Sequence, residues 1–316
     1  MLERAWVIVI AGVLPMACVA ETEGRDDLGA AYEPGEDDDV DADADDGKGD
    51  DPVAIGAVAS VCATGYSSID CHPSSTSFAV DGTTREVLWK VPAGMPPAGG
   101  WPVVLAFHGT NDPAGKFFAW SYWSAVDNLY GGYYETKTVQ GLLDAGFAVL
   151  APKARVRVGS IYWDTNIPPY ATDWDSSPDG AFVERLFDEI EAGTFGPLNV
   201  DRKYAMGLSS GGYMASRLAV SYPGEIQGIA LQSASYATCI SSLPCDVSDE
   251  DLPEEHAATL LMAGYWDPIV PLYTINDYFY ALEDNATPAE LHVVGYASHQ
   301  WTSSSPGWVL GWFQGH

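Results

Sequence analysis

The feature that most constrains the fold of this chain is the alternation of short apolar runs with helix-like segments. The apolar runs lie at 103–107, 147–151, 204–207, 226–231, 259–262 and 291–294. Such runs are typical of strands buried between two layers of helices. Helical patterns lie between them at 179–191, 212–221 and 271–283. The alternation predicts an α/β fold with a mostly parallel central sheet flanked by helices on both faces, and 85–91 predicts an earlier, partly antiparallel strand.

Composition sets the size of the core and the sign of the electric field around the protein. Of the 316 residues, 47% are hydrophobic and 12% aromatic, which is enough for one sizeable buried core. The formal net charge is -30, from 44 Asp+Glu against 14 Lys+Arg. Such a field repels phosphate backbones, so we expect no nucleic-acid partner. A solvated acidic surface accounts for the charge, and a salt-rich habitat is the alternative.

The first residues of the chain predict export. An apolar run at 6–13 is too short to span a bilayer and resembles the core of a signal peptide, which we place at 1–17. The segment 14–18 resembles a bacterial lipoprotein box in which Cys18 carries the lipid, although Pro15 and Met16 depart from that pattern. Lipidation would give a cell-surface lipoprotein with an outer-membrane anchor. Cleavage after Ala20, which would release a secreted protein, is the alternative.

An acidic segment separates this region from the rest of the chain. Between Glu21 and Asp51 there are 15 acidic and two basic residues. Like charges repel and extend a chain, so we interpret 18–52 as a disordered linker and 53–316 as the catalytic domain. Asp43, Asp45 and Gly47 suggest a calcium loop, but the glutamate that would close such a loop is missing.

The cysteines predict two disulfides. Setting Cys18 aside, four of the five cysteines remain, and an even set in an exported protein indicates cross-links. Three pairings exist, and we favour the local one, Cys62–Cys71 with Cys239–Cys245. A cysteine-based metal site does not fit the spacing.

One motif carries chemistry. Gly207–Leu208–Ser209–Ser210–Gly211 has the form G-x-S-x-G, directly after a predicted strand and before a predicted helix. A tight strand-to-helix turn of this kind holds the serine in a strained conformation above the sheet, with glycines that prevent clashes. We therefore predict Ser209 as a nucleophile; an idle serine in a glycine-rich turn is the alternative.

A serine hydroxyl needs a base, and two later strand ends offer the partners. Asp267 follows the strand at 259–262, although it could instead cap a helix. His299 follows the strand at 291–294 and is the histidine that lies both after this acid and beyond a strand end. We expect His299 to accept the proton of Ser209 while Asp267 fixes its tautomer. His108 precedes the elbow, so we interpret it as a residue that shapes a loop.

The remaining parts of the site are predicted from their neighbours. The backbone N–H groups of Thr110 and Ser210 are expected to form the oxyanion hole. Trp266 and Trp301 flank the predicted acid and base, and with Tyr213 we assign them to binding a hydrophobic acyl chain or a waxy solid. Four further tryptophans follow strand ends, each with a core position as the alternative: Trp120, Trp123, Trp163 and Trp174.

The segments 207–217 and 233–239 resemble those of the extracellular polyhydroxyalkanoate depolymerases, above all the medium-chain-length type. They are more distantly similar to the poly(3-hydroxybutyrate) depolymerase and feruloyl esterase group. The resemblance implies an α/β-hydrolase fold and a secreted serine esterase that cleaves a hydrophobic polyester through an acyl-enzyme. It implies a triad of Ser209, Asp267 and His299 with neither metal nor cofactor. The acidic linker departs from the family pattern, and adsorption to a polymer is expected to rest on the catalytic domain.

Three other functions stay open from the sequence. A feruloyl or acetyl esterase acting on plant polysaccharide, or a cutinase-like hydrolase of aromatic polyesters, would use the same triad. A surface adhesion lipoprotein on an inactive hydrolase scaffold would lack one triad member, and none is missing. We expect the protein to act as a monomer.

Overall fold

A computed structural model describes residues 60–239 and 245–316. The predicted signal peptide 1–17, the linker 18–52 and the lipidation site Cys18 lie outside these residues. Within the two described ranges, no helix has the length and apolar character needed to cross a membrane.

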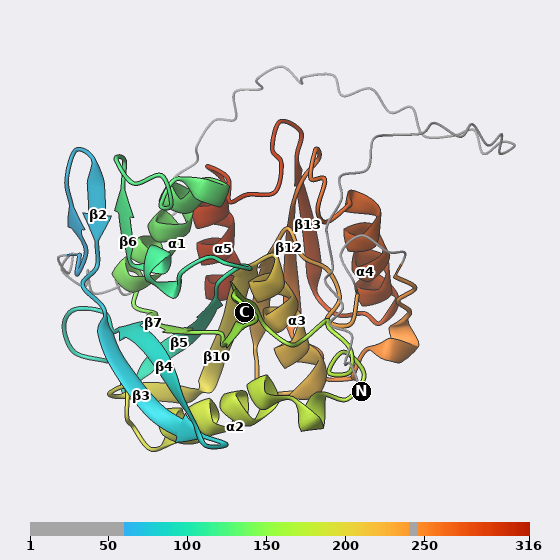
Figure 1. Cartoon of the computed structure of the whole chain (residues 1–316), viewed down its shortest axis with the longest axis horizontal. Helices are drawn as coiled ribbons and strands as arrows, with labels where there is room; N and C mark the ends of the chain where they lie inside the picture. The colour runs from blue at the N-terminus through green and yellow to red at the C-terminus, as the bar shows by residue number, and fades with distance from the viewer. Residues whose placement is uncertain (1–59, 240–244) are drawn as a thin grey trace, which may run out of the picture. The chain divides into compact units, whose positions relative to one another are not determined.

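The core of the domain is one eight-stranded sheet (Figure 1). Its order is β13-β12-β11-β10-β5-β7-β4-β3. Neighbouring strands from β13 to β7 pair in parallel, whereas β4 runs antiparallel to both β7 and β3. The strands span Ser74–Val80 (β3), Thr83–Lys90 (β4), Trp101–Phe107 (β5), Ala148–Pro152 (β7), Leu198–Leu208 (β10), Gly228–Gln232 (β11), Ala258–Gly264 (β12) and Ala289–Val294 (β13). The predicted, mostly parallel α/β architecture is confirmed.

Helices cover both faces of this sheet (Figure 1). Alternate residues of β5 face opposite layers, because successive side chains of a strand point to opposite sides. Val103 and Leu105 pack with helices α2, α3 and α4, whereas Val104 and Ala106 pack with α1 and α5. The helices span Gly132–Asp144 (α1), Pro178–Glu191 (α2), Ser210–Ser221 (α3), Leu272–Asp284 (α4) and Ser305–Gly315 (α5). The sequence patterns predicted α2, α3 and α4 but not α1, α5 or β3.

A second, three-stranded antiparallel sheet lies beside the main one. It consists of β1 (Ala63–Thr64), β2 (Ser68–Asp70) and β6 (Ala119–Ser121). The remaining short elements are the β8–β9 hairpin (Val156–Arg157, Ser160–Ile161) and the 3-10 turns η1 (Ala114–Phe117), η2 (Leu129–Gly131), η3 (Trp174–Ser176) and η4 (Asp249–Asp251).

Both predicted disulfides are formed. Cys62 is bonded to Cys71 across the small sheet, and both cysteines are buried. The Cys71 N–H also donates to the Phe118 carbonyl, so the cross-link joins the start of the domain to the segment before β6. Cys239 is bonded to Cys245.

Candidate active site

Ser209 occupies the tight turn between β10 and α3. Its backbone has φ 55° and ψ -125°, a region that residues with a side chain rarely adopt. The turn is held because the Ser209 N–H donates to the Gln232 carbonyl over 3.0 Å and the Ser209 carbonyl accepts the Tyr213 N–H over 2.9 Å. A Cβ at Gly211 would lie 1.9 Å from the Phe107 carbonyl oxygen, so only glycine fits there. The strained elbow that the motif predicts is therefore present.

Asp267 and His299 form a hydrogen-bonded pair. The distance from His299 Nδ1 to Asp267 Oδ2 is 2.8 Å, and both side chains are buried. Asp267 Oδ1 accepts the N–H groups of Ile269 and Val270, each over 2.9 Å. Helix α4 begins later, with Pro271 at its N-cap, so Asp267 does not cap that helix. Its carboxylate therefore fixes the orientation of the imidazole.

The electrostatics of Asp267 follow from this geometry. Burial by itself raises the pKa of the carboxyl. The hydrogen bond to His299 and the N–H groups of Val270 and Ile269 outweigh that effect, and the pKa of Asp267 lies below its ordinary value. Asp267 therefore stays ionised beside the imidazole at neutral pH.

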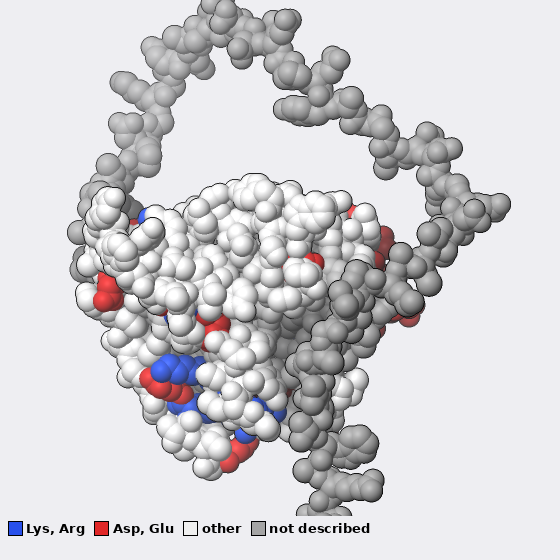
Figure 2. All heavy atoms as spheres, turned by 45° about the horizontal axis from the view of Figure 1, so that its top comes forward, with Lys and Arg blue, Asp and Glu red and all other residues white. Residues whose placement is uncertain are grey.

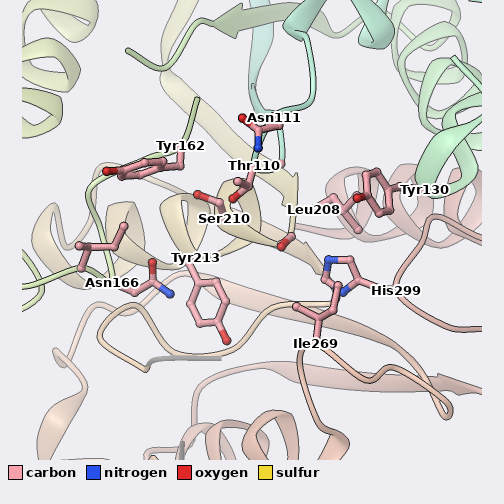
Figure 3. A pocket seen from close by; sticks show the side chains of 13 residues that line it. Thr110, Asn111, Tyr130, Tyr162, Asn166, Leu208, Ser210, Tyr213, Ile269 and His299 are labelled. Atoms are coloured by element: carbon pink, nitrogen blue, oxygen red, sulfur yellow. The ribbon is translucent and has the colours of Figure 1, made fainter. Parts of the chain in front are cut away.

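Ser209 and His299 line the same cavity, which has a volume of about 470 Å³. Figure 3 shows His299, Tyr130 and Ile269 toward one side of this cavity, with Tyr162 and Asn166 toward the other. Because Nδ1 is bonded to Asp267, Nε2 is the ring nitrogen left for proton transfer. Within the described residues, no hydrogen bond joins the Ser209 hydroxyl to this imidazole. Such bonds are often long in unliganded enzymes and tighten with substrate.

The two predicted oxyanion donors reach the same cavity. Thr110 and Ser210 both line it together with Ser209, and Figure 3 shows the side chains of Thr110 and Ser210 near each other. Ser210 is the first residue of α3, where backbone N–H groups have no partner within the helix and bind anions readily. In the described part of the chain, the Thr110 N–H donates to no other group. Both groups are thus available to a developing oxyanion.

His108 shapes the loop that carries Thr110, as its position in the sequence suggests. Its Nδ1 is 2.8 Å from the Gly109 carbonyl, and its Nε2 accepts the Ala154 N–H over 3.1 Å. Burial lowers the pKa of His108 to about 4, so the ring is neutral at pH 7. Its two nitrogens are both used, which leaves none for catalysis.

The structure places the three predicted substrate-binding residues in different surroundings. Tyr213 lines the cavity, and burial raises the pKa of its hydroxyl, which has no partner among the described groups. Trp266 is 67% exposed and lies outside the cavity lining. Trp301 is 0% exposed, so its predicted contact with substrate is wrong. Its backbone N–H donates to the Tyr130 carbonyl over 2.9 Å, and its ring packs in the core with α1 and α5.

The other four tryptophans divide between core and surface. Trp163 and Trp174 are buried in the main core, which was the alternative for each. Trp120 is half-buried, and Trp123 is strongly exposed.

Several residues of the cavity were not predicted. They are Asn111, Tyr130, Tyr162, Asn166, Ile167 and Ile269. Ile269 carried a signal, because it lies two residues beyond Asp267. The sequence signal next to Tyr130 is the Gly-Gly pair that follows it, which indicates a break in secondary structure but does not indicate a functional site. In the structure its ring lies perpendicular to the imidazole of His299, with 6.0 Å between ring centres.

A buried ion cluster supports the loops around the site. The Lys116 ammonium lies 2.8 Å from Asp112 and 3.6 Å from Glu135, and it donates to the Leu129 carbonyl over 3.0 Å. It thereby links the loop of Thr110 to the turn of Tyr130. Burial, with the charge of Asp112, raises the pKa of Glu135 to about 8. One buried ammonium thus faces two carboxyl groups, and the raised pKa of Glu135 favours its protonated form.

Comparison with known proteins places the chain in a family. It is 44% identical over 232 residues to the poly(3-hydroxyoctanoate) depolymerase of Pseudomonas fluorescens, covering 73% of this chain and 80% of that protein. The chain belongs to the poly(3-hydroxyoctanoate) depolymerase family. It is accordingly a carboxylic ester hydrolase with the α/β-hydrolase fold. No family model matches the chain.

Solved structures agree on the fold. A Lactobacillus plantarum protein described as a carboxylesterase superposes with a TM-score of 0.53 at 14% identity, covering 77% of this chain and 97% of that one. Esterase PE8 superposes with a TM-score of 0.50 at 16% identity, covering 72% and 99%.

Proposed function

We propose that the protein is a secreted serine esterase that hydrolyses a hydrophobic polyester, a medium-chain-length polyhydroxyalkanoate, through an acyl-enzyme on Ser209. One observation carries this proposal. Ser209, on its strained turn, and His299, held by Asp267, open on one cavity. The relative from Pseudomonas fluorescens, a poly(3-hydroxyoctanoate) depolymerase, supports the choice of polymer.

In the proposed acylation, His299 transfers a proton twice, first from Ser209 and then to the leaving alkoxide. The Ser209 Oγ attacks the ester carbonyl carbon while His299 Nε2 takes its proton. The negative charge on the carbonyl oxygen is stabilised by the N–H groups of Ser210 and Thr110, each of which typically contributes about 2.7–4 kcal/mol to the transition state. His299 then protonates the departing alkoxide, and Asp267 stabilises the transient imidazolium. Water repeats the sequence on the acyl-enzyme and releases the acid.

The lining of the cavity favours a neutral, apolar acyl group. The residues that line it include no Lys, Arg, Asp or Glu within the described ranges. Six of the 13 lining residues are aromatic or aliphatic, namely Tyr130, Tyr162, Ile167, Leu208, Tyr213 and Ile269. An alkyl side chain of a polyester gains free energy by burial against such residues. A sugar-linked ester would gain more from a polar groove.

A substrate panel tests the proposal. The wild-type protein is incubated with poly(3-hydroxyoctanoate) emulsion, with feruloylated arabinoxylan and with an aromatic polyester, beside Ser209→Ala. We expect the wild type to clear the emulsion and the variant to leave it turbid. Release of ferulate without clearing would instead support the plant-polysaccharide esterase, and clearing by Ser209→Ala would exclude Ser209 as the nucleophile.

We also propose that the protein acts outside the cytoplasm as a monomer, tethered through lipid on Cys18. The two disulfides support this location, because such bonds persist in oxidising compartments. Metabolic labelling with an alkyne palmitate tests the tether. Labelled wild type with unlabelled Cys18→Ser is the expected result, and an unlabelled wild type would leave the protein freely secreted.

A further inference from the structure

Large apolar side chains are exposed on the same segments that supply Tyr130 and Ile269 to the lining of the catalytic cavity. One group comes from the segment 119–133, which contains β6, η2 and the start of α1. Its exposed members are Tyr122, Trp123, Val126, Leu129, Tyr130 and Tyr133. A second group, on the loops after β12 and β13, contains Tyr265, Trp266, Ile269 and Tyr296. We call the two groups together the aromatic rim.

The rim is continuous with the cavity on both sides of His299. Tyr130 and Ile269 are exposed and also line the cavity. In the first group, edge-to-face contacts connect Trp123, Tyr122, Trp120 and Tyr133, with ring centres 4.7–6.5 Å apart. In the second group, the backbone N–H of Trp266 donates to the carbonyl of Ala297, two residues before His299. The rim therefore reaches the lining of the cavity through Tyr130 in the first group and Ile269 in the second.

Hydrogen bonds within the segment hold the side chains of the first group in exposed positions. The Asn128 side chain donates to the carbonyls of Tyr122 and Ser124 over 3.0 and 2.7 Å, and it accepts the Trp120 ring N–H over 3.1 Å. Asp127 accepts the Ser121 N–H over 3.0 Å. The polar side chains thus hold the loop from within. Tyr122 and Trp123 point to solvent, 60% and 81% exposed.

Charge is nearly absent from these loops. The segments 119–133, 265–273 and 295–304 contain no Lys, Arg or Glu, and Asp127 and Asp267 are their acidic residues. Both carboxylates are used in hydrogen bonds inside the loops. Figure 2, in which the end bearing these loops faces forward, shows a broad surface with few charged side chains. In a chain of net charge -30, an apolar and uncharged face of this kind marks a contact surface.

We infer that the aromatic rim is the surface by which the protein adsorbs to solid, water-insoluble polyester, so that ester bonds at the solid surface are presented to Ser209. This inference rests on the proposed function and adds to it the residues that hold the enzyme on the solid. An uncharged aliphatic polyester matches a face that carries neither cations nor free anions. On adsorption, the polymer surface replaces the water over the aromatic rings, and each ring can bury roughly 150–250 Å² of its surface. A lipid bilayer is the competing partner, and the experiment includes it.

The test separates adsorption from chemistry. The full-length protein and the double variant Tyr122→Ser/Trp123→Ser are mixed with poly(3-hydroxyoctanoate) particles, and the protein left in solution is measured. We expect the affinity of the double variant for the particles to fall by about tenfold or more, because two rings no longer cover the polymer. Neither residue lines the cavity, so kcat/KM for a soluble p-nitrophenyl ester should change by less than about twofold.

Two further variants test whether the loss of adsorption is specific to the apolar surface of the rim. Val126→Lys keeps every ring but puts a charge into the rim, and it should also weaken adsorption. Tyr280→Ser removes an exposed tyrosine toward the far end of α4 and should leave adsorption unchanged. Adsorption that survives both rim changes overturns the inference, as does binding of the wild type to phosphatidylcholine vesicles but not to particles. Normal adsorption without any clearing would instead reject the proposed polyesterase activity.

Discussion

His299 and Asp267 join two loops that follow neighbouring strands, with Nδ1 and Oδ2 2.8 Å apart. The pair sets the tautomer of the imidazole, because an ionised carboxylate accepts only from a protonated Nδ1. Its pH dependence follows from the lowered pKa of Asp267. A lowered carboxyl pKa adds stability that is present above the ordinary value of about 3.9 and is lost as the pH falls through the folded value.

Asp267→Asn should nearly abolish turnover with little change in fold. The asparagine oxygen could still accept the N–H groups of Ile269 and Val270, but its NH₂ group would face Nδ1 and favour the wrong tautomer. We expect kcat to fall by about 10³–10⁴-fold. Asp284→Asn, at the exposed end of α4, is the matched control. A variant at position 267 with wild-type kcat would remove this aspartate from the site.

Gly131→Ala should damage both stability and catalysis. Gly131 has φ 73°, and a Cβ there would lie 2.2 Å from the Trp301 carbonyl oxygen, so the segment of His299 must shift. We expect a loss of about 1–3 kcal/mol in urea unfolding, together with a lower kcat. Gly141→Ala, in the interior of α1 with open space around it, should instead add about 0.5–1 kcal/mol. Equal effects of the two substitutions would contradict this explanation.

Glu135 should make the protein less stable as the pH rises from about 5 to about 8. Its pKa is raised by burial to about 8, so the folded state binds a proton that the unfolded state has released. Stability then falls with pH between the unfolded pKa of about 4.3 and the folded value. In Glu135→Gln this part of the slope should be missing. Urea unfolding at several pH values measures it, and an identical slope in both proteins would show Glu135 ionised in the fold.

Removal of the Cys62–Cys71 bond should cost about 2–3 kcal/mol of unfolding free energy, because it closes a loop with a sequence separation of 9. The double variant Cys62→Ser/Cys71→Ser tests this by calorimetry. Reductant should lower the melting temperature of the wild type more than that of the variant, which retains only Cys239–Cys245. A wild type that melts unchanged in excess reductant would argue that the bond contributes nothing.

The buried parallel strands and the elbow could be predicted from the sequence because each has a local signal. The run at 103–107 is apolar throughout, and the glycines at 207 and 211 stand where the turn leaves no room for a Cβ. The order of the chain then places Asp267 and His299 after later strands, where parallel topology brings the strand ends together.

The missed elements lack such signals. Helix α1 buries Glu135, Thr136, Thr138 and Gln140, so its inner face does not read as an apolar stripe. Helix α5 carries Gly307, Gly311 and Gly315, which weaken a helical prediction. Trp301 was placed in the pocket because of its nearness to His299 in sequence. Its direction depends on the hydrogen bond to Tyr130, a residue far away in the chain.

Covalent labelling tests the central claim most directly. The full-length protein is treated with a fluorophosphonate, and the adduct is located by mass spectrometry while activity on a soluble ester is followed. We expect one adduct, on Ser209, formed in step with the loss of activity, and no labelling of Ser209→Ala. Complete inactivation with Ser209 unmodified, or near-normal turnover by Ser209→Ala, would contradict the assignment of the nucleophile.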